Sequence, residues 1–342
     1  MPYSSGMETK TPNTLTEAIT YFSDPKTALN AFVQIRWPDG VCCPTCGSVA
    51  VSFLTNQNRW QCHAKHARRQ FSAKVGTIFE DSALPLEKWL VAMWLEVNAK
   101  NSISSCELAR ALGVTQKSAW FMLHRVRHAL HTGSFDKKLA GVIEADETFV
   151  GGLAKNMHKD RRARTIHGTG GNNKTAVMGL LERHAEKGKS QVRAKVINNT
   201  RRETLHSVIH QNVSAGSQLY TDAWQAYRNL DAAYSHAFVD HVEKYVDGAV
   251  HTNGLENFWA LFKRCIKGTH VSIEPFHLAR YVDSEAFRFN NRKTNDGGRF
   301  ALAMPGVVGK RLTYKALIGT SELEGRKPSD NGAESEENSL PN

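Results

Sequence analysis

The sequence of 342 residues contains no run of about eighteen apolar residues, so no segment is predicted to cross a membrane. Its N-terminus lacks the basic and then apolar pattern of a secretory signal peptide. The six cysteines do not resemble a secreted disulfide framework, because three of them lie between Cys42 and Cys46. Internal repeats and long low-complexity blocks are also missing. These absences argue against membrane, secreted and repeat proteins, and favour a globular protein of the reducing cytoplasm with a metal site.

What the chain does have is an excess of positive charge, with 44 Lys and Arg against 33 Asp and Glu and a net charge of +11. Residues 321–342 hold six acidic and two basic residues, a net charge of −4, so the rest of the chain carries about +15. A protein this basic suits a polyanionic partner, and nucleic acid is the usual one. The acidic segment 318–342 is rich in Gly, Ser and Asn and is predicted to be a disordered tail.

Hydrophobic periodicity changes once along the chain, near Gly141. Before it, apolar residues recur at helical spacing, and the expected helices cover residues 16–32 with a break at Asp24-Pro25, 84–98, and two helices within 104–130. After it, expected strands alternate with helices: strands at 142–150, 175–181, 191–197 and 218–222, helices at 200–210, 254–266 and 275–289. Strands with a helix inserted between them predict an α/β or α+β catalytic domain in the second half.

A candidate metal site lies near the N-terminus, in the segment Cys43-Pro-Thr-Cys-Gly47. The Pro and Gly shape a turn that directs two thiolates at one ion, and Cys62 and His66 follow after a short hairpin. A set of three Cys and one His is tetrahedral and closed, as expected for structural Zn²⁺. Cys42 is a weaker alternative to Cys43, because its spacing to Cys46 is one residue too long.

Residues 104–130 have the pattern of a helix-turn-helix. Ser104 and Thr115 are suitable N-caps for the two helices, and Gly113 breaks the chain between them. A plain αα-hairpin that packs in the interior is the alternative, and the basic chain and the preceding metal site favour DNA binding over it. The residues expected to face DNA are Gln116, Lys117 and Trp120.

Candidate catalytic carboxylates lie on two of the expected strands. Strand alternation places Glu144, Asp146 and Thr148 on one face of an otherwise apolar strand, where an acid is costly unless it binds a cation or a partner. Asp222 ends the later strand 218–222, and active sites gather at strand ends in such sheets. Acids brought together there are suitable ligands for Mg²⁺ in a two-metal phosphoryl transferase.

A third ligand is expected in the segment His251–Trp259. Asn253 can cap the following helix with Glu256 three residues later, so this pair is also explained as a capping box alone. Lys263 and Arg264 add charge two turns into that helix, where they would attract phosphate. A basic loop at 155–167, which includes Arg161, Arg162 and Arg164, is expected to arch over the substrate strand.

Taken in order, these pieces resemble bacterial insertion-sequence transposases of the zinc-ribbon, ISXO-like type. The matching segments are Cys43–Gly47, Arg69–Ser72, Gly76–Glu80, Leu84–Trp89, Leu108–Gln116, Trp120–Arg125, Glu144–Thr148, Gly151-Gly152, Thr221–Trp224 and Asn253–Trp259. The resemblance spans about residues 25–295. One departure is the second half of the zinc site, where some relatives have Cys-x-x-Cys and this chain has Cys62 and His66.

The resemblance implies a helix and zinc ribbon over residues 15–80, a helix-turn-helix region over 84–135 and an RNase-H-like catalytic domain over 140–295. It also implies metal-dependent cleavage and transfer of double-stranded DNA at insertion-sequence terminal repeats, with Mg²⁺ or Mn²⁺, by a homo-oligomer associated with the nucleoid. Asp146 and Asp222 match the first two acids of the triad. Asn253 matches the Asn often assigned as the third member in this family, and Glu256 matches the Glu of similar transposases.

Three functions are consistent with these features. The first is an active transposase, and the presence of both Asp146 and Asp222 favours it. The second is a DNA-binding regulator, or an inactive remnant that binds the element ends without catalysis. The third is a structure-specific nuclease with the same metal site but no joining step.

Overall fold

The computed structural model describes residues 12–131, 137–152, 158–160, 163, 174–184, 189–223, 225–239 and 250–319. The chain divides into two compact units, residues 1–311 and 312–342. In the described part of the second unit there is one short helix, α11 (Tyr314–Leu317), and the expected acidic tail otherwise lies outside the described residues. All other elements belong to the first unit. None of the described helices is long and apolar enough to cross a membrane.

The chain begins with the predicted pair of helices, α1 (Leu15–Phe22) and α2 (Pro25–Arg36). Asp24 causes the break between them, because its carboxylate accepts from the backbone N–H of Thr27 and caps α2 ahead of Pro25. A small antiparallel sheet follows, made of β1 (Val51–Leu54), β2 (Arg59–Cys62) and β3 (Gln70–Phe71) in that order. The turn between its first two strands holds a 3₁₀ helix, η1 (Thr55–Gln57).

Three further helices follow, α3 (Leu86–Asn98), α4 (Ser105–Leu112) and α5 (Gln116–Leu130). The predicted caps of the last two are confirmed: Ser104 accepts from the N–H of Glu107 and Thr115 accepts from that of Ser118. Gly113 adopts a left-handed conformation (φ +60°) and ends α4. The structure therefore contains two helices joined by a tight turn where the sequence predicts them.

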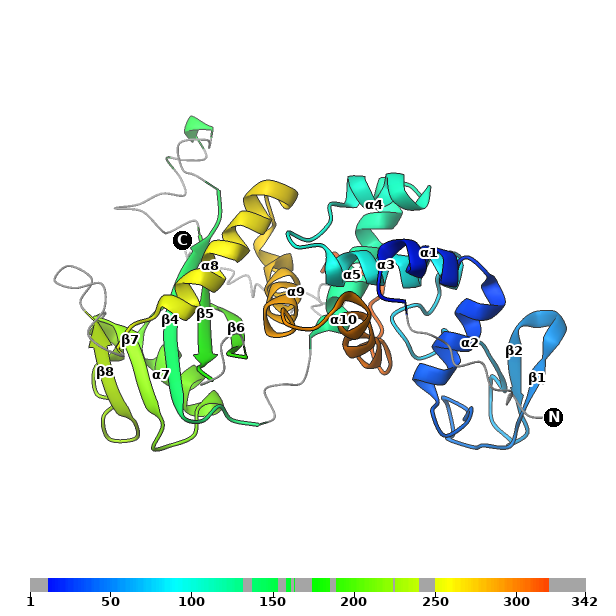
Figure 1. Cartoon of the computed structure of the whole chain (residues 1–342), viewed down its shortest axis with the longest axis horizontal. Coiled ribbons are helices and arrows are strands. Elements are labelled where there is room, and N and C mark those ends of the chain that lie inside the picture. The colour runs from blue at the N-terminus through cyan, green and yellow to red at the C-terminus, as the bar shows by residue number, and fades with distance from the viewer. Residues whose placement is uncertain are drawn as a thin grey trace, which may run out of the picture. The chain divides into compact units, whose positions relative to one another are not determined.

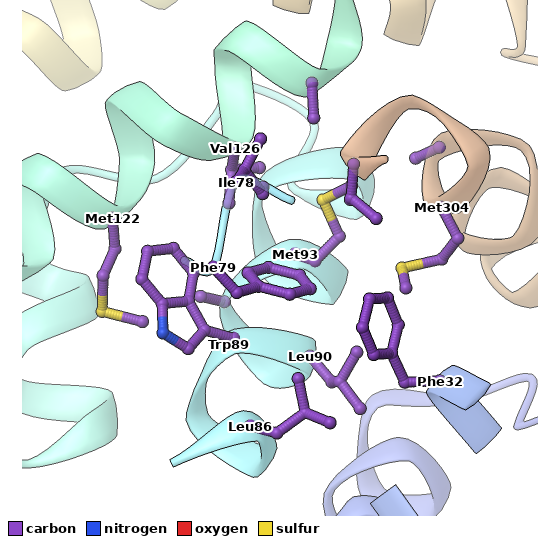
Figure 2. Close-up of a cluster of buried hydrophobic side chains, with 14 of the residues drawn as sticks. Phe32, Ile78, Phe79, Leu86, Trp89, Leu90, Met93, Met122, Val126 and Met304 are labelled. Atoms are coloured by element: carbon purple, nitrogen blue, oxygen red, sulfur yellow. The ribbon is translucent and has the colours of Figure 1, made fainter. Parts of the chain in front are cut away.

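One hydrophobic core holds these helices and the small sheet together. Figure 2 shows part of it, with Phe32 of α2, Ile78 and Phe79, and Trp89 and Met93 of α3 directed at one another. The C-terminal part of the first unit returns to the same core through α10 (Asp296–Ala303) and the 3₁₀ helix η6 (Met304–Val307). The residues expected as two regions, 15–80 and 84–135, thus share a single core.

A buried network of charged groups joins α3, α5 and α9 (Leu278–Asn290). The carboxylate of Glu96, with no exposed surface, accepts from Nε of Arg127 at 2.9 Å and from Oγ of Ser284 at 2.8 Å. Nη1 of Arg288 lies 3.6 Å from the same carboxylate. Burial alone would raise the pKa of Glu96, but the two guanidinium groups lower it below its ordinary value. The carboxylate is therefore charged and fully paired.

The second half folds around a five-stranded sheet in the order β6-β5-β4-β7-β8 (Figure 1). Its strands are β4 (Val142–Val150), β5 (Thr175–Glu182), β6 (Gln191–Ile197), β7 (Gln218–Asp222) and β8 (Ser235–Val239). The first three pair antiparallel, whereas β7 and β8 run parallel to β4. Three antiparallel strands extended on one side by parallel ones are the sheet of an RNase-H-like fold, which confirms the expected fold class.

Helices cover both faces of this sheet. On one face, α7 (Arg202–Asn212) packs against Ile143 and Ala145 of β4. On the other, α8 (Asn253–Cys265) and α9 pack against Val177 and Leu181 of β5. Figure 1 shows α8 crossing β4 and β5.

Two expected elements differ in detail from the structure. The helix expected over 275–289 begins with a 3₁₀ turn, η5 (Pro275–His277), and continues as α9. Between α8 and α9 the chain forms a π-helical turn, η4 (Ile266–His270). A 3₁₀ helix, η3 (Gln225–Tyr227), follows β7. Strand β8 was not predicted.

Candidate active site and zinc site

Strand β4 presents alternate side chains to the two faces of the sheet. Ile143 and Ala145 pack into the core beneath α7, whereas Glu144 and Asp146 make hydrogen bonds to residues of α8. This confirms the predicted alternation. The side chains of Glu144 and Asp146 therefore lie under the helix that carries the candidate third ligand.

The parallel pairing of β4 with β7 brings the second aspartate to the first. The paired register runs from Val142 with Gln218 to Glu144 with Tyr220. Two residues further along each strand, the same register places Asp146 level with Asp222. Pairing has ended there, so the two carboxylates stand at the point where the strands separate.

The electrostatics of Asp146 confirm that carboxylates gather at this point. The pKa of Asp146 is raised to about 6, and burial is the largest cause, followed by the negative charge of Asp222. Hydrogen bonds from the backbone N–H of Glu147 and the indole of Trp259 oppose the shift, and the charge of Glu256 adds to it. A carboxylate repelled by two others is stabilised by a bound cation, which is the property expected of a metal ligand.

The start of α8 differs from the capping box that the sequence suggested. Asn253 does not cap the helix but is its first residue, and Thr252 occupies the N-cap position without a side-chain hydrogen bond to the helix. The cap comes instead from β4, because Oε2 of Glu144 accepts from the backbone N–H of Leu255 at 2.9 Å. Glu256 is exposed in the first turn, and Asn253 is exposed beside it.

A second contact holds α8 to the sheet directly at Asp146. The indole Nε1 of Trp259 donates to Oδ2 of Asp146 at 3.0 Å. Gly179 lies opposite Asp146 in the β4–β5 register, and a Cβ added there would meet Cζ2 of Trp259 at 2.6 Å. The glycine thus leaves the space in which the indole sits. Sequence reasoning missed this role of Trp259, because only the strand register reveals that Gly179 faces Asp146.

Glu147, although it follows Asp146 directly, belongs to the opposite face of the sheet. It is mostly buried near Tyr227, whose side chain lies in the core beneath α7. The pKa of Glu147 is raised to about 8, chiefly by burial and in addition by the charges of Asp146 and Asp222, whereas the Tyr227 hydroxyl opposes the change. Glu147 therefore holds its proton more tightly than Asp146 does, and it lies on the opposite face from the carboxylates beneath α8.

The predicted zinc ligands converge in the small sheet. Ligand atoms of Cys43, Cys46, Cys62 and His66 all lie within 4.8 Å of one another. The closest pairs are Sγ of Cys43 with Nε2 of His66 at 3.5 Å, and Sγ of Cys46 with Sγ of Cys62 at 3.7 Å. All the cysteines are free thiols, and four soft ligands at these separations suit tetrahedral Zn²⁺.

The surrounding backbone prepares two of these ligands for a metal. Burial disfavours the Cys43 thiolate, but the backbone N–H groups of Thr45 and Cys46 outweigh it and lower the pKa of Cys43 to about 7. Gly47, at φ +74°, closes the turn by donating to the carbonyl of Cys43. Nδ1 of His66 lies 2.6 Å from the carbonyl of Ala67, which holds the proton there and leaves Nε2 free to bind.

Known proteins match both parts of the chain. The model of the ISXO2-like transposase domain matches residues 138–290, and that of the transposase zinc-ribbon domain matches residues 23–66. An uncharacterized transposase-like protein of Haemophilus influenzae is 31% identical over 104 residues, which cover 84% of it and 30% of this chain. The chain belongs to the ISXO2-like transposase family.

A longer relative extends the likeness over most of the transposase. An uncharacterized protein in transposable element ISH50 of Halobacterium salinarum is 28% identical over 294 residues, 83% of this chain and 96% of the relative. Among solved structures, a chain of the simian T-cell lymphotropic virus intasome in complex with PP2A regulatory subunit B56 gamma matches at 12% identity. The match covers 52% of this chain and 63% of the intasome chain, with a TM-score of 0.26. The fold assignment rests on the strand order and on the family match.

The side chains expected to meet DNA differ in their exposure. Gln116 and Lys117 are exposed at the start of α5, and Gln116 donates to Oγ of Ser105. Trp120 is half-buried, and its ring packs edge-on against His124 and His277 at centroid distances of 4.5 and 5.5 Å. Within α5, the first turn is therefore better placed than Trp120 to reach a nucleic acid.

The remaining basic candidates lie on α8 and in the loop after β4. Lys263 and Arg264 are exposed in the last turn of α8. Arg161, Arg162 and Arg164 lie outside the described residues.

Proposed function

We propose that this family member is an active insertion-sequence transposase that cuts DNA strands at the ends of its element and joins them to target DNA. The observation that carries the proposal is the carboxylate cluster around Asp146, where burial and, after it, the negative charges of Asp222 and Glu256 raise the pKa of that residue to about 6. A fold built only for stability would avoid such repulsion, because charges without a partner are costly when buried.

We propose Asp146, Asp222 and Glu256 as the residues that hold Mg²⁺ or Mn²⁺. Glu256 is preferred to Asn253 because its charge acts on Asp146, whereas Asn253 is held through its backbone N–H, 3.4 Å from Nδ1 of His251. Divalent ions bound by these oxygens would activate the attacking oxygen and neutralise the leaving oxygen of the phosphodiester. The contribution of the protein is to position these ligands on rigid strands and one anchored helix.

The other parts of the chain supply DNA contacts in this proposal. The zinc ribbon, held by Cys43, Cys46, Cys62 and His66, and the exposed start of α5 would bind the terminal repeats, with Gln116 and Lys117 in the groove. Lys263 and Arg264 would face phosphates near the cut, and a homo-oligomer on the nucleoid would pair two element ends. The basic charge of the chain supports such an interface.

The test uses purified protein, a plasmid with the inverted repeats that flank the gene, and Mg²⁺ or Mn²⁺. Asp146→Ala and Asp222→Ala should abolish cleavage and joining but retain binding to the ends in a gel-shift assay. Glu256→Gln should lose activity in the same way, and Asn253→Ala should lose far less.

Three results would change the assignment. Cleavage that survives Asp146→Ala would exclude this site as the catalytic centre. Binding to the ends by the wild type without any cleavage would favour a regulator or an inactive remnant. Cleavage without joined products would favour a structure-specific nuclease.

A further inference from the structure

Buried polar groups link β4 to the first turn of α8, two residues from Asp146. Glu144 is 1% exposed, and both of its carboxylate oxygens accept hydrogen bonds. Oε1 accepts from Nε of Arg183 at 2.6 Å, and Oε2 accepts from the N–H of Leu255 at 2.9 Å. A negative charge at this end of a helix also interacts favourably with the helix dipole.

Arg183 extends the link to the residues just before the helix. Its Nη2 lies 2.6 Å from Nδ1 of His251 and donates to the His251 carbonyl. A guanidinium has no acceptor, so Nδ1 must accept and His251 is the neutral tautomer with its proton on Nε2. The 3.8 Å separation between His251 and Glu144 is for that reason not an ion pair. Burial, and after it the charge of Arg183, lower the pKa of His251, in agreement with the neutral form.

The close approach of the Glu144 carboxylate to α8 requires a glycine at position 254 of the helix. A Cβ added at Gly254 would meet the Glu144 oxygens at 2.8 and 2.9 Å, closer than real Cβ contacts. A larger residue would have to push the strand side chain away from the helix. The cap therefore depends on Glu144 and Gly254 together.

A local cap was available and is not used. Thr252 stands at the N-cap position, and threonine is a good capping residue, yet it makes no cap hydrogen bond and its backbone (φ −115°, ψ 20°) is not extended. A threonine cap would tie the helix only to its own chain. A cap from β4 ties the helix to the strand that carries Asp146, which fixes Glu256 relative to that aspartate.

We infer that Glu144 is a positioning residue of the metal site: it does not hold the ion but sets the place of Glu256 by capping α8 from the strand of Asp146. This inference rests on the proposed function. It predicts that loosening the cap weakens metal binding while the metal ligands themselves remain, as substitutions behind metal ligands do.

The experiment compares three full-length variants with the wild type and with Asp146→Ala. Glu144→Gln removes the charge of the cap, and Gly254→Ala obstructs the cap while leaving Glu144 and Arg183 unchanged. Gly268→Ala is the matched control, because a Cβ there would meet nothing within 4 Å and Gly268 lies just beyond the same helix. Mn²⁺ binding is measured without DNA from the spin-resonance signal of the free ion, with Asp146→Ala as the baseline. Hydrogen exchange of the α8 amides is followed in parallel.

We expect Glu144→Gln and Gly254→Ala to weaken Mn²⁺ binding by about ten- to a hundredfold and to speed exchange in the first turn of α8. Gly268→Ala should bind as the wild type does. Strand cleavage by the two cap variants should return at high Mn²⁺, whereas Asp146→Ala should remain inactive at every concentration. A residue that only stabilised the fold would not give this recovery.

Two results would overturn the inference, and they differ. If the wild type binds Mn²⁺ and both cap variants bind it equally well, the inference fails and the proposed function stands. If the wild type binds no more Mn²⁺ than Asp146→Ala, the proposed metal site is wrong, and the inference about Glu144 is wrong with the site on which it rests. A variant that misfolds is recognised by loss of protection from hydrogen exchange in β5. The Mn²⁺ binding of the other cap variant then decides whether the inference holds.

Discussion

Replacing Asp146 by Asn should make the metal-free protein more stable at neutral pH. The carboxyl titrates near pH 6 in the folded protein against 3.8 as its ordinary value, a difference of about two pKa units. Each unit corresponds to about 1.4 kcal/mol, so the folded state carries a penalty of up to about 3 kcal/mol at pH 7.5. Asn removes the charge and keeps one oxygen, which can accept from Nε1 of Trp259 but leaves the N–H of Glu147 without its acceptor, so the substitution should recover about 1–2 kcal/mol of this penalty.

The pH dependence of this difference in stability identifies the raised pKa of Asp146 as its cause. An acid whose pKa is raised by folding binds its proton more tightly in the folded state, so stability falls as pH rises from about 4 to about 6 and stays low above that. The melting temperature of Asp146→Asn should exceed that of the wild type by several degrees at pH 7.5, and the difference should disappear near pH 4.

Calorimetry in buffer freed of divalent ions by resin, without a soluble chelator that would also remove zinc, measures the difference. Saturating Mn²⁺ should reverse the order, because ligand binding stabilises only the protein that binds it. A lower melting temperature for Asp146→Asn at pH 7.5, or a gain of equal size at pH 4, would refute the reasoning.

Three further substitutions test other parts of the structure. Cys62→Ser should lower the zinc content measured by atomic absorption and unfold the small sheet, and retained zinc would argue against this ligand set. Gly179→Ala should cost about 1–3 kcal/mol of stability, because the new Cβ overlaps the Trp259 ring. Tryptophan fluorescence should report the displaced indole. Unchanged melting and unchanged fluorescence would contradict the contact between Gly179 and Trp259. Glu96→Gln should cost about 3–5 kcal/mol of stability, because it leaves the buried guanidinium of Arg127 without its carboxylate. An unchanged melting temperature would show that the ion pair contributes little to stability.

Features that depend on neighbouring residues could be predicted from the sequence. Ser104 and Thr115 cap their helices as expected, because a cap involves only the next three residues. The zinc ligands were found for the same reason, since a turn and one hairpin bring Cys46 and Cys62 together. Alternation along β4 also depends only on local geometry.

Features that depend on distant residues could not be predicted. The first turn of α8 looked like a local capping box at Asn253, but the acceptor is Glu144, 111 residues earlier. Strand β8 is a five-residue edge strand whose pairing with β7 has no signal of its own in the sequence. The half-buried ring of Trp120 depends on His277, which joins it only after the chain has folded.

The long-range cap on α8 also means that this part of the fold is completed late in the synthesis of the chain. The strands β4 and β7, with Asp146 and Asp222, are synthesised before residues 253–265. At elongation rates of about 5–20 residues per second, the nascent chain carries both aspartates for some seconds without the helix that completes them. A chain that ended in this interval would keep the four clustered Cys and His side chains and the α4–α5 pair, but it would lack Glu256 and the helix that Glu144 caps.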